Sequence, residues 1–295
     1  MKKSAVTRIV IYSVLIALLA GLLGTALAFH HQFGWHGIRR IIGGEMDMEF
    51  DSDGTEIIRA DQGQKISLEA ASVREIQVEW VAGDVQILPG DAAGIEIQET
   101  ASEKPLVYSL REGKLKIQFC EETIGMKFGV NLRMPSKDLT ITVPADWAGQ
   151  ELEIHSVSAD VEVRELSLEE VEFQGVSGRF DLKNCKINEL SMETVSGKVT
   201  MDGQVQKVDC ESVSADCELV LANVPREISM EGVSGRLELT LPADAGFTVE
   251  MDGLSKDLDT DFAVTSENGK FVAGDGGCRI DIDGVSGNAK IYQAK

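Results

Sequence analysis

Five segments of the chain share one pattern, and this pattern decides the fold: LEIHSVSADVEV (152–163), VEFQGVSGRFDL (171–182), LSMETVSGKVTM (190–201), VDCESVSADCEL (208–219) and ISMEGVSGRLEL (228–239). Each segment is two runs of alternating apolar and polar residues joined by Val-Ser-Gly or Val-Ser-Ala. A closing copy follows at Val285, a degenerate copy at Leu254, and a partial copy precedes them at Val81. Alternation with a period of two is typical of β-strands with one buried face, and it excludes a helical repeat.

The spacing of the copies predicts how the strands stack. From Val157 onwards the steps between successive copies are 19, 19, 18, 20, 21 and 31 residues. Such units are too short for propeller blades of about 40 residues, and they suit the coils of a parallel β-solenoid, stacked about 4.8 Å apart. An antiparallel meander is the alternative, but hairpins usually turn on Asn-Gly or Asp-Gly. We therefore predict an all-β fold, a parallel β-solenoid of ~19-residue coils.

The N-terminal segment predicts a membrane anchor. Residues 9–29 form an uncharged apolar run, long enough to cross a hydrocarbon core of about 30 Å as one transmembrane helix. Lys2, Lys3 and Arg8 precede it, which favours a cytoplasmic N-terminus at residues 1–8 and an extracytoplasmic body. Ala26-Leu27-Ala28 offers a signal-peptidase pattern, so a cleaved signal peptide is the alternative; the length of the run favours the anchor. The expected location is the cell membrane, single-pass, with the bulk of the chain extracytoplasmic.

Two further regions complete the predicted organisation. Residues 46–64 are polar, acid-rich and weakly patterned, which indicates that residues 30–64 form a juxtamembrane stalk. Residues 65–295 form the β-strand-repeat domain. Within this domain, residues 108–119 alternate around Glu112-Gly113 and predict a β-hairpin. The 31-residue step before Val285 contains a glycine-rich loop, which indicates a coil with an excursion or a cap of the stack.

The charge of the chain is strongly acidic and unevenly placed. The 295 residues contain 28 Lys and Arg against 49 Asp and Glu, a net charge of −21. The first 44 residues hold five bases and no acid, which leaves a net charge of −26 on residues 45–295. A nucleic-acid partner is excluded, because phosphate binding needs clustered Lys and Arg.

Outward positions of the predicted coils place charges in columns. Two residues before the repeated valine stand Glu193, Glu211, Glu231 and Asp252. Carboxylates stacked about 4.8 Å apart repel one another, and Ca²⁺ would relieve that repulsion. A solvated acidic face is the simpler interpretation, because no Ca²⁺-binding loop motif is present. We expect no cofactor, and these four residues are the candidates for a Ca²⁺ site. Three residues after the valine, opposite charges are expected to meet across coils: Asp160 with Arg179, Lys198 with Asp216, and Asp216 with Arg236.

No residue pattern marks a catalytic site. His155, the histidine of the repeat, occupies the outward position that is acidic or amide in other coils. The corner serines recur with the repeat, whereas a nucleophile would occur once beside a base. The five cysteines form no zinc motif. Cys210 and Cys217 occupy core positions; a disulfide between them is one option, and reduced core thiols are the interpretation preferred here. The chain is not expected to be an enzyme.

Four motifs together give a family resemblance: TITVPAD (140–146), the iterated L-x-I-x-x-V-S-G-x-V-x-V, LPAD (241–244) and GGCRIDIDGVSGNAKI (276–291). In these motifs the chain resembles the bacterial putative-adhesin family, a β-strand-repeat domain of unknown function, over residues 60–295. The resemblance implies a β-solenoid in the cell envelope behind one N-terminal membrane segment. It also implies an association with adhesion and with envelope-stress operons, and it supplies no catalytic motif.

These observations lead to one expected function and two alternatives. The expected function is a membrane-anchored, non-catalytic binding or scaffold protein that contacts an envelope protein or a wall polymer. The first alternative is an accessory regulator of a cell-envelope stress response. The second is a carbohydrate-active β-helix enzyme, since parallel β-helices also carry polysaccharide lyases and hydrolases.

Overall fold

The computed structural model describes residues 38–41, 45–48, 57–61, 63–100, 104–120, 124–127, 136–147, 149–252, 255–267 and 270–294. The predicted membrane segment, residues 9–29, lies outside this part of the chain. Among the described residues, no helix has the length and apolar character needed to cross a bilayer. The regular structure described is β, apart from one short 3₁₀ turn at Ala70–Ser72.

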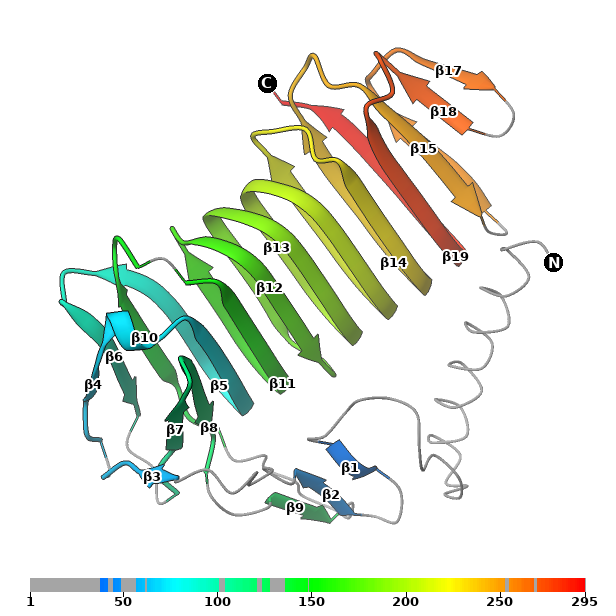
Figure 1. Ribbon diagram of the computed structural model, residues 1–295. Helices are drawn as coiled ribbons and strands as arrows, with labels where there is room; N and C mark the ends of the chain where they lie inside the picture. Colours follow the sequence, from blue (N-terminus) through cyan, green and yellow to red (C-terminus); the bar gives the residue numbers. More distant parts are fainter. Residues whose placement is uncertain are drawn as a thin grey trace.

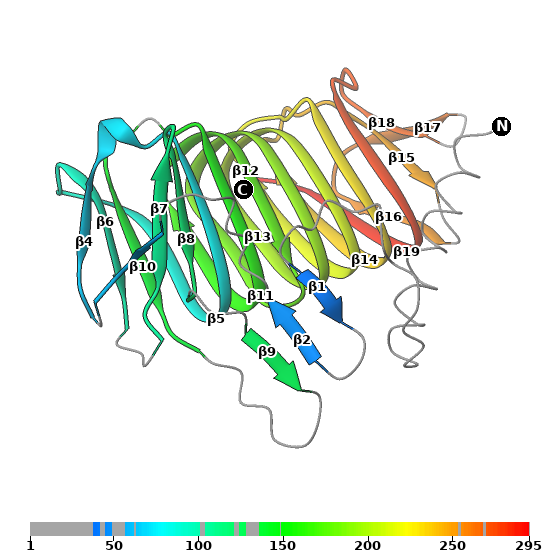
Figure 2. The same cartoon turned by 60° about the horizontal axis from the view of Figure 1, so that its bottom comes forward.

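The strands follow one another along the chain as β1 (Ile38–Ile41), β2 (Glu45–Met48), β3 (Ile58–Arg59), β4 (Ile66–Glu69), β5 (Glu75–Gly90), β6 (Gly94–Glu99), β7 (Val107–Arg111), β8 (Lys114–Gln118), β9 (Ile124–Lys127), β10 (Leu139–Pro144), β11 (Glu151–Arg164), β12 (Ser167–Gly175), β13 (Arg179–Leu221), β14 (Glu227–Leu241), β15 (Phe247–Asp252), β16 (Ser255–Thr260), β17 (Val264–Glu267), β18 (Lys270–Ala273) and β19 (Cys278–Gln293). The long strands, including β13, pass through the Val-Ser-Gly corners and so combine both runs of a repeat. Figure 1 shows them stacked side by side in one row, and Figure 2 shows the same stack from below.

The repeats stack in parallel, as their alternation and spacing predict. Leu152 of β11 is the register partner of Val171 in β12, and Val161 is the partner of Phe180 in β13. The register therefore advances by one 19-residue unit from coil to coil. The next steps follow the sequence spacing as well, since Val208 of β13 pairs with Ile228 of β14. The parallel pairing identifies the corners as bends within a coil and not as hairpin turns.

The two ends of the stack are interleaved. The last strand, β19, pairs in parallel with β14 on one edge and with β15 and β16 on the other, so Ile280 lies between Ile228 and Val249. The copy at Val285 thus lies between the copies at Val233 and Leu254, although it comes last in the sequence. β15 and β16 form the outermost coil, and the β17–β18 hairpin extends β15 antiparallel as a cap.

The other end of the stack has a related arrangement. β5 is the first strand of the parallel stack in the sequence, but it lies between β11 and an outer coil built from β8 and β10. β8 pairs with the first half of β5, and β10 pairs with the second half. Antiparallel strands continue the sheets beyond this coil: β7 and β3 extend β8, while β6 and β4 extend β10. At both ends, therefore, a strand nearer the chain terminus is covered by one nearer its middle.

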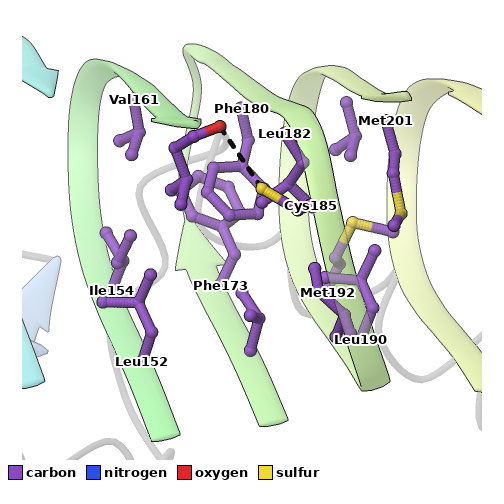
Figure 3. Close-up of a cluster of buried hydrophobic side chains, with 14 of the residues drawn as sticks. Leu152, Ile154, Val161, Phe173, Phe180, Leu182, Cys185, Leu190, Met192 and Met201 are labelled. Carbon is purple, nitrogen blue, oxygen red and sulfur yellow. Dashed lines mark hydrogen bonds between the residues drawn. The ribbon is translucent and has the colours of Figure 1, made fainter. Parts of the chain in front are cut away.

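We call the run before each corner the first strand of a coil and the run after it the second strand. The core lies between these two strands, where inward residues from successive coils form continuous columns. Leu152, Ile154, Val161 and Val163 line one coil and are at most 2% exposed. In the next coil, Phe173 stacks on Phe180 with ring centroids 4.5 Å apart (Figure 3). Complete burial of one such side chain stabilises the fold by about 1.5–3 kcal/mol. Because every coil contributes several, the stack has a core throughout its length.

Two local features outside the repeat can be compared with the sequence. The predicted hairpin is present: β7 and β8 pair antiparallel, and Glu112 and Gly113 adopt the positive φ values of 53° and 91° that a two-residue turn requires. The segment interpreted as a stalk contains strands that its weak patterning did not indicate. β1 and β2 pair with each other, and β2 also pairs with β9 in a small three-stranded sheet.

Candidate functional site

The Val-Ser-Gly corners hold adjacent coils together. The hydroxyl groups of Ser158, Ser177 and Ser196 each donate to the carbonyl oxygen of the repeated valine in the neighbouring coil. The oxygen–oxygen distances are 3.5, 3.4 and 3.4 Å. The serine therefore recurs because the contact between coils recurs. This role agrees with the interpretation of these residues as corner residues.

The residue after the serine lies against the backbone of the preceding coil. Gly178 has φ +122°, and a Cβ at this position would lie 2.3 Å from the carbonyl oxygen of Ala159. We expect Gly178→Ala to lower the free energy of unfolding by about 1–3 kcal/mol, because strain and a backbone clash act together. Gly235→Ala is the matched control, since its Cβ would lie 2.9 Å from Ala215 O without a left-handed φ. Urea unfolding of both variants would contradict this account if Gly235→Ala were the more damaging.

The outward side of the first strand of each coil carries the predicted acidic column, with one correction. Glu211 is the register partner of Glu231, as expected. The next residue of the column after Glu231, however, is Asp283 of β19, which is its register partner. Asp252 pairs with Asp283 from the other side. The insertion of β19 is the cause. The prediction that Asp252 stacks directly on Glu231 is wrong, and the column gains a carboxylate that the order of the repeats did not reveal.

A neighbouring outward column adds further carboxylates to this surface. We use the term acidic face for eight outward carboxylates on the first strands of neighbouring coils, in the spatial order β13, β14, β19 and β15. They are Glu193, Asp209, Glu211, Glu231, Glu250, Asp252, Asp281 and Asp283. Burial raises the pKa of Glu211, and the charges of Glu193 and Glu231 raise it further. Burial likewise raises the pKa of Glu231, and Asp283 adds to the effect. The folded chain thus holds Glu211 and Glu231 in their ionised form at an electrostatic cost. Among the described residues, no group of three or more His, Cys, Asp or Glu is placed to hold a metal ion.

Relieving this repulsion should stabilise the fold. We expect Glu211→Gln to increase the free energy of unfolding by up to about 1 kcal/mol, since like charges on adjacent strands destabilise a sheet. A carboxyl whose folded pKa is raised destabilises the fold when ionised, so stability should rise as the pH falls through that pKa towards the ordinary value of 4.5. The measurement is the melting temperature of the native chain and of the variant, each between pH 7 and pH 5. A lower melting temperature for the variant at neutral pH would contradict the expectation.

Near β5 and β8, the charges on the same outward side are paired with one another. The Glu153 carboxylate lies 2.8 Å from His155 Nε2 and 2.9 Å from Lys114 Nζ. Burial opposes ionisation of Glu153, but hydrogen bonds from His155 and Lys114 outweigh it and lower its pKa to about 2. Glu79 accepts from Lys116 and Gln118 at 3.0 and 2.9 Å. His155 is therefore half-buried and engaged by a carboxylate.

Glu153 gives a prediction opposite in sign to that for Glu211. Its lowered pKa contributes stability above pH 4.5, which is lost as the pH falls from 4.5 towards 2. We expect Glu153→Gln to cost about 2–3 kcal/mol at neutral pH. The loss should vanish near pH 2, where the native carboxyl also becomes protonated. Denaturant unfolding at both pH values tests this, and a pH-independent loss would assign the effect to packing alone.

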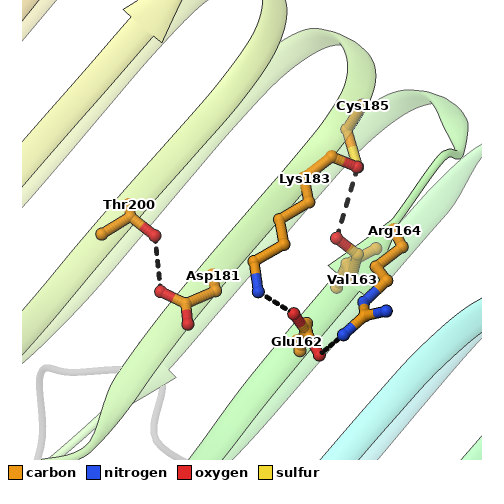
Figure 4. Close-up of polar contacts among 7 residues, drawn as sticks. All are labelled: Glu162, Val163, Arg164, Asp181, Lys183, Cys185 and Thr200. Atoms are coloured by element: carbon orange, nitrogen blue, oxygen red, sulfur yellow. Dashed lines mark hydrogen bonds and ion pairs between the residues drawn. The ribbon is translucent and has the colours of Figure 1, made fainter.

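The outward side of the second strands carries alternating charges that pair across coils, with partners that differ in part from those predicted. Figure 4 shows Glu162 between Arg164, which is on the same strand, and Lys183, which belongs to the next coil. Lys198 contacts Glu218 at 2.8 Å, and Glu218 lies two residues after the expected partner Asp216. Asp160 meets the next coil through the backbone N–H of Arg179, which donates to it at 2.9 Å. Asp216 and Arg236 are register partners, as predicted.

A buried ion pair, which the sequence pattern does not predict, lies beside β5 and β8. Lys137 Nζ contacts the Glu99 carboxylate and donates to the carbonyl oxygen of Lys104 at 2.8 Å, and both charged side chains are 1% exposed. The ammonium also lies over the rings of Phe119 and Trp80, 4.5 and 5.1 Å from their centroids. Burial lowers the pKa of Lys137, although Glu99 opposes this. Neither charged residue belongs to a repeat, so no periodicity pointed to them.

Parallel coils of about 19 residues, each bent at a Val-Ser-Gly or Val-Ser-Ala corner, define this protein as a β-strand-repeat domain. The chain belongs to the Toastrack DUF4097 family, whose model matches residues 73–220. This confirms the resemblance inferred from the repeat motifs. No curated protein matches the chain in sequence.

Several solved structures are similar to the chain at low sequence identity. A putative adhesin from Bacteroides fragilis is 14% identical with a TM-score of 0.46, and the match covers 81% of this chain and 97% of that one. A putative cell adhesion protein from Clostridium sporogenes is 13% identical with a TM-score of 0.34, covering 79% of this chain and 99% of that one. A putative lipid binding protein from Parabacteroides distasonis is 13% identical with a TM-score of 0.36, covering 80% and 98%.

Proposed function

We propose that the chain is a non-catalytic binding protein of the cell envelope, held at the outer side of the membrane by residues 9–29. In this proposal, the acidic face contacts an envelope protein or wall polymer that presents cationic groups. The supporting observation is the column Glu211–Glu231–Asp283–Asp252, in which register partners on adjacent strands are all carboxylates. Repulsion within the column would be relieved by a cationic partner, because opposite charges across an interface favour association.

The assignment of a binding role is supported by how the reactive residue types are used. The corner serines Ser158, Ser177 and Ser196 bond to the next coil, and His155 is engaged by Glu153. These side chains therefore make contacts within the stack of coils. A repeated flat surface also presents the same chemistry several times, which suits a partner that is itself extended or repetitive.

Crosslinking in intact cells tests the proposal. The tagged full chain is compared with a variant of the acidic face, Glu211→Gln with Glu231→Gln and Asp283→Asn. The matched control is Glu162→Gln with Glu218→Gln and Glu238→Gln, which removes the same charge from the second strands. A partner recovered with the native chain and the control, but lost with the acidic-face variant, is the expected result. Equal recovery with all three chains would contradict the role of the acidic face.

The predicted topology has a separate test. Protease added outside intact cells should digest the solenoid and leave a short membrane-associated N-terminal fragment. A solenoid that is degraded only after the membrane is opened would contradict both the location and the proposed binding role.

A further inference from the structure

Two cysteines face each other inside one coil. Cys210 and Cys217 are seven residues apart, on either side of the corner Val213-Ser214-Ala215, and are 0% and 1% exposed. Both are thiols in this structure. They occupy the inward positions three residues before and four residues after the repeated valine.

The geometry of the other coils shows that these two positions meet across the core. In an equivalent coil the same positions hold Phe173 and Phe180, whose rings stack 4.5 Å apart. In the coil of Cys210, the same two positions hold thiols, and these thiols interact with each other. A hydrogen bond to the Cys210 thiol, together with complete burial, raises the pKa of the Cys217 thiol well above its usual range.

We propose that Cys210 and Cys217 form an intramolecular disulfide when the chain folds in an oxidising compartment. The corner between them places the two residues on facing strands of one coil with their thiols in contact, and a disulfide forms where the two Cα atoms come within about 7 Å of each other. The inference rests on the proposed function only in placing the body outside the cytoplasm, where disulfides persist.

The reaction belongs to the folding chain and not to the finished stack. Cys210 is the register partner of Met230, and Cys217 is the partner of Leu237, so the next coil covers the pair once it is in place. Before that, a thiolate of one cysteine attacks a small or protein disulfide and releases one thiol. The second cysteine then attacks the mixed disulfide, closes the Sγ–Sγ bond and releases the second thiol. Two cysteine thiols are oxidised and one oxidant disulfide is reduced.

Mass spectrometry of the full chain tests the proposal without any substitution. The protein is alkylated under denaturing conditions, without reductant, and digested with trypsin, which leaves both cysteines in the peptide 208–226. We expect this peptide unalkylated and about 2 Da lighter than its dithiol form, while Cys120, Cys185 and Cys278 are alkylated. Cleavage after Glu211 separates the two cysteines, so only a disulfide would keep the fragments linked.

Two preparations distinguish failure of the disulfide from failure of the proposed location. The first is chain recovered from its own cells, and the second is full chain refolded with oxidised glutathione. A bond in both supports the inference. A bond only after refolding supports the pairing and contradicts the extracytoplasmic location, whereas double alkylation in both overturns the inference. Reductant should also lower the melting temperature of the oxidised chain, and it should not do so for Cys210→Val with Cys217→Val.

Discussion

Replacing Lys137 by methionine is expected to lower the free energy of unfolding by about 3–5 kcal/mol, because it leaves the Glu99 carboxylate buried without its counter-charge. Glu99 has a second contact, since it accepts from the backbone N–H of Leu106 at 3.0 Å. Lys137 in turn spans separate segments through Lys104 and the two aromatic rings. Its removal should therefore loosen the packing around the first coil as well as the ion pair. Urea unfolding of the two proteins measures the loss.

Two further variants separate the buried charge from the loss of packing. Lys183→Met removes an exposed lysine that also contacts a glutamate, and it should cost no more than about 1 kcal/mol. The double variant Lys137→Met with Glu99→Leu removes both buried charges and should recover much of the stability lost by the single variant. If the double variant were as unstable as Lys137→Met, packing and not an unpaired carboxylate would account for the loss.

Removing residues 278–295 is expected to unfold the C-terminal part of the stack. Among the β19 side chains that the structure describes, five are buried in the core: Cys278, Ile280, Ile282, Ala289 and Ile291. The larger ones each stabilise the fold by about 1.5–3 kcal/mol, against a typical total of about 5–15 kcal/mol for a domain. The deletion also leaves the facing edges of β14 and of the outermost coil without their ladder partner.

Hydrogen exchange of the truncated chain measures where protection is lost. Amides of β14, β15 and β16 should exchange rapidly, whereas those of β5 and β11 should remain protected, since each coil contacts only its neighbours. Ile280→Ala serves as a milder control, because it opens a cavity and keeps the strand. Full protection of β15 in the truncated chain would contradict the interleaved order.

The repeat pattern predicts the interior of the stack well and its ends poorly. Period-two alternation alone identifies Leu152 and Ile154 as inward residues, and the 19-residue step identifies their neighbours. It cannot decide whether the copy at Leu254 or that at Val285 contacts the copy at Val233. All these strands carry the same inward pattern and present similar edges, so the pattern is equally satisfied by either order.

The features that fix the ends lie outside the repeat. The β17–β18 hairpin covers the edge of β15, and the Glu99–Lys137 pair joins the end of β6 to the segment that precedes β10. The acidic face shows the consequence for the candidate site. Glu211 and Glu231 were placed correctly because they lie in interior coils, while Asp283 was missed and Asp252 was misplaced because they lie at the interleaved end.

The interleaved ends also decide how such a protein can change its length in evolution. A coil in the middle of β13 contacts only the coils before and after it, so one more unit of about 19 residues can be inserted there with both ends intact. Loss of a unit from either terminus would instead remove a strand that has a partner on each side. Each inserted coil would lengthen the acidic face by about 4.8 Å. The distance that the protein spans is thereby adjustable in fixed increments, from its middle and not from its ends.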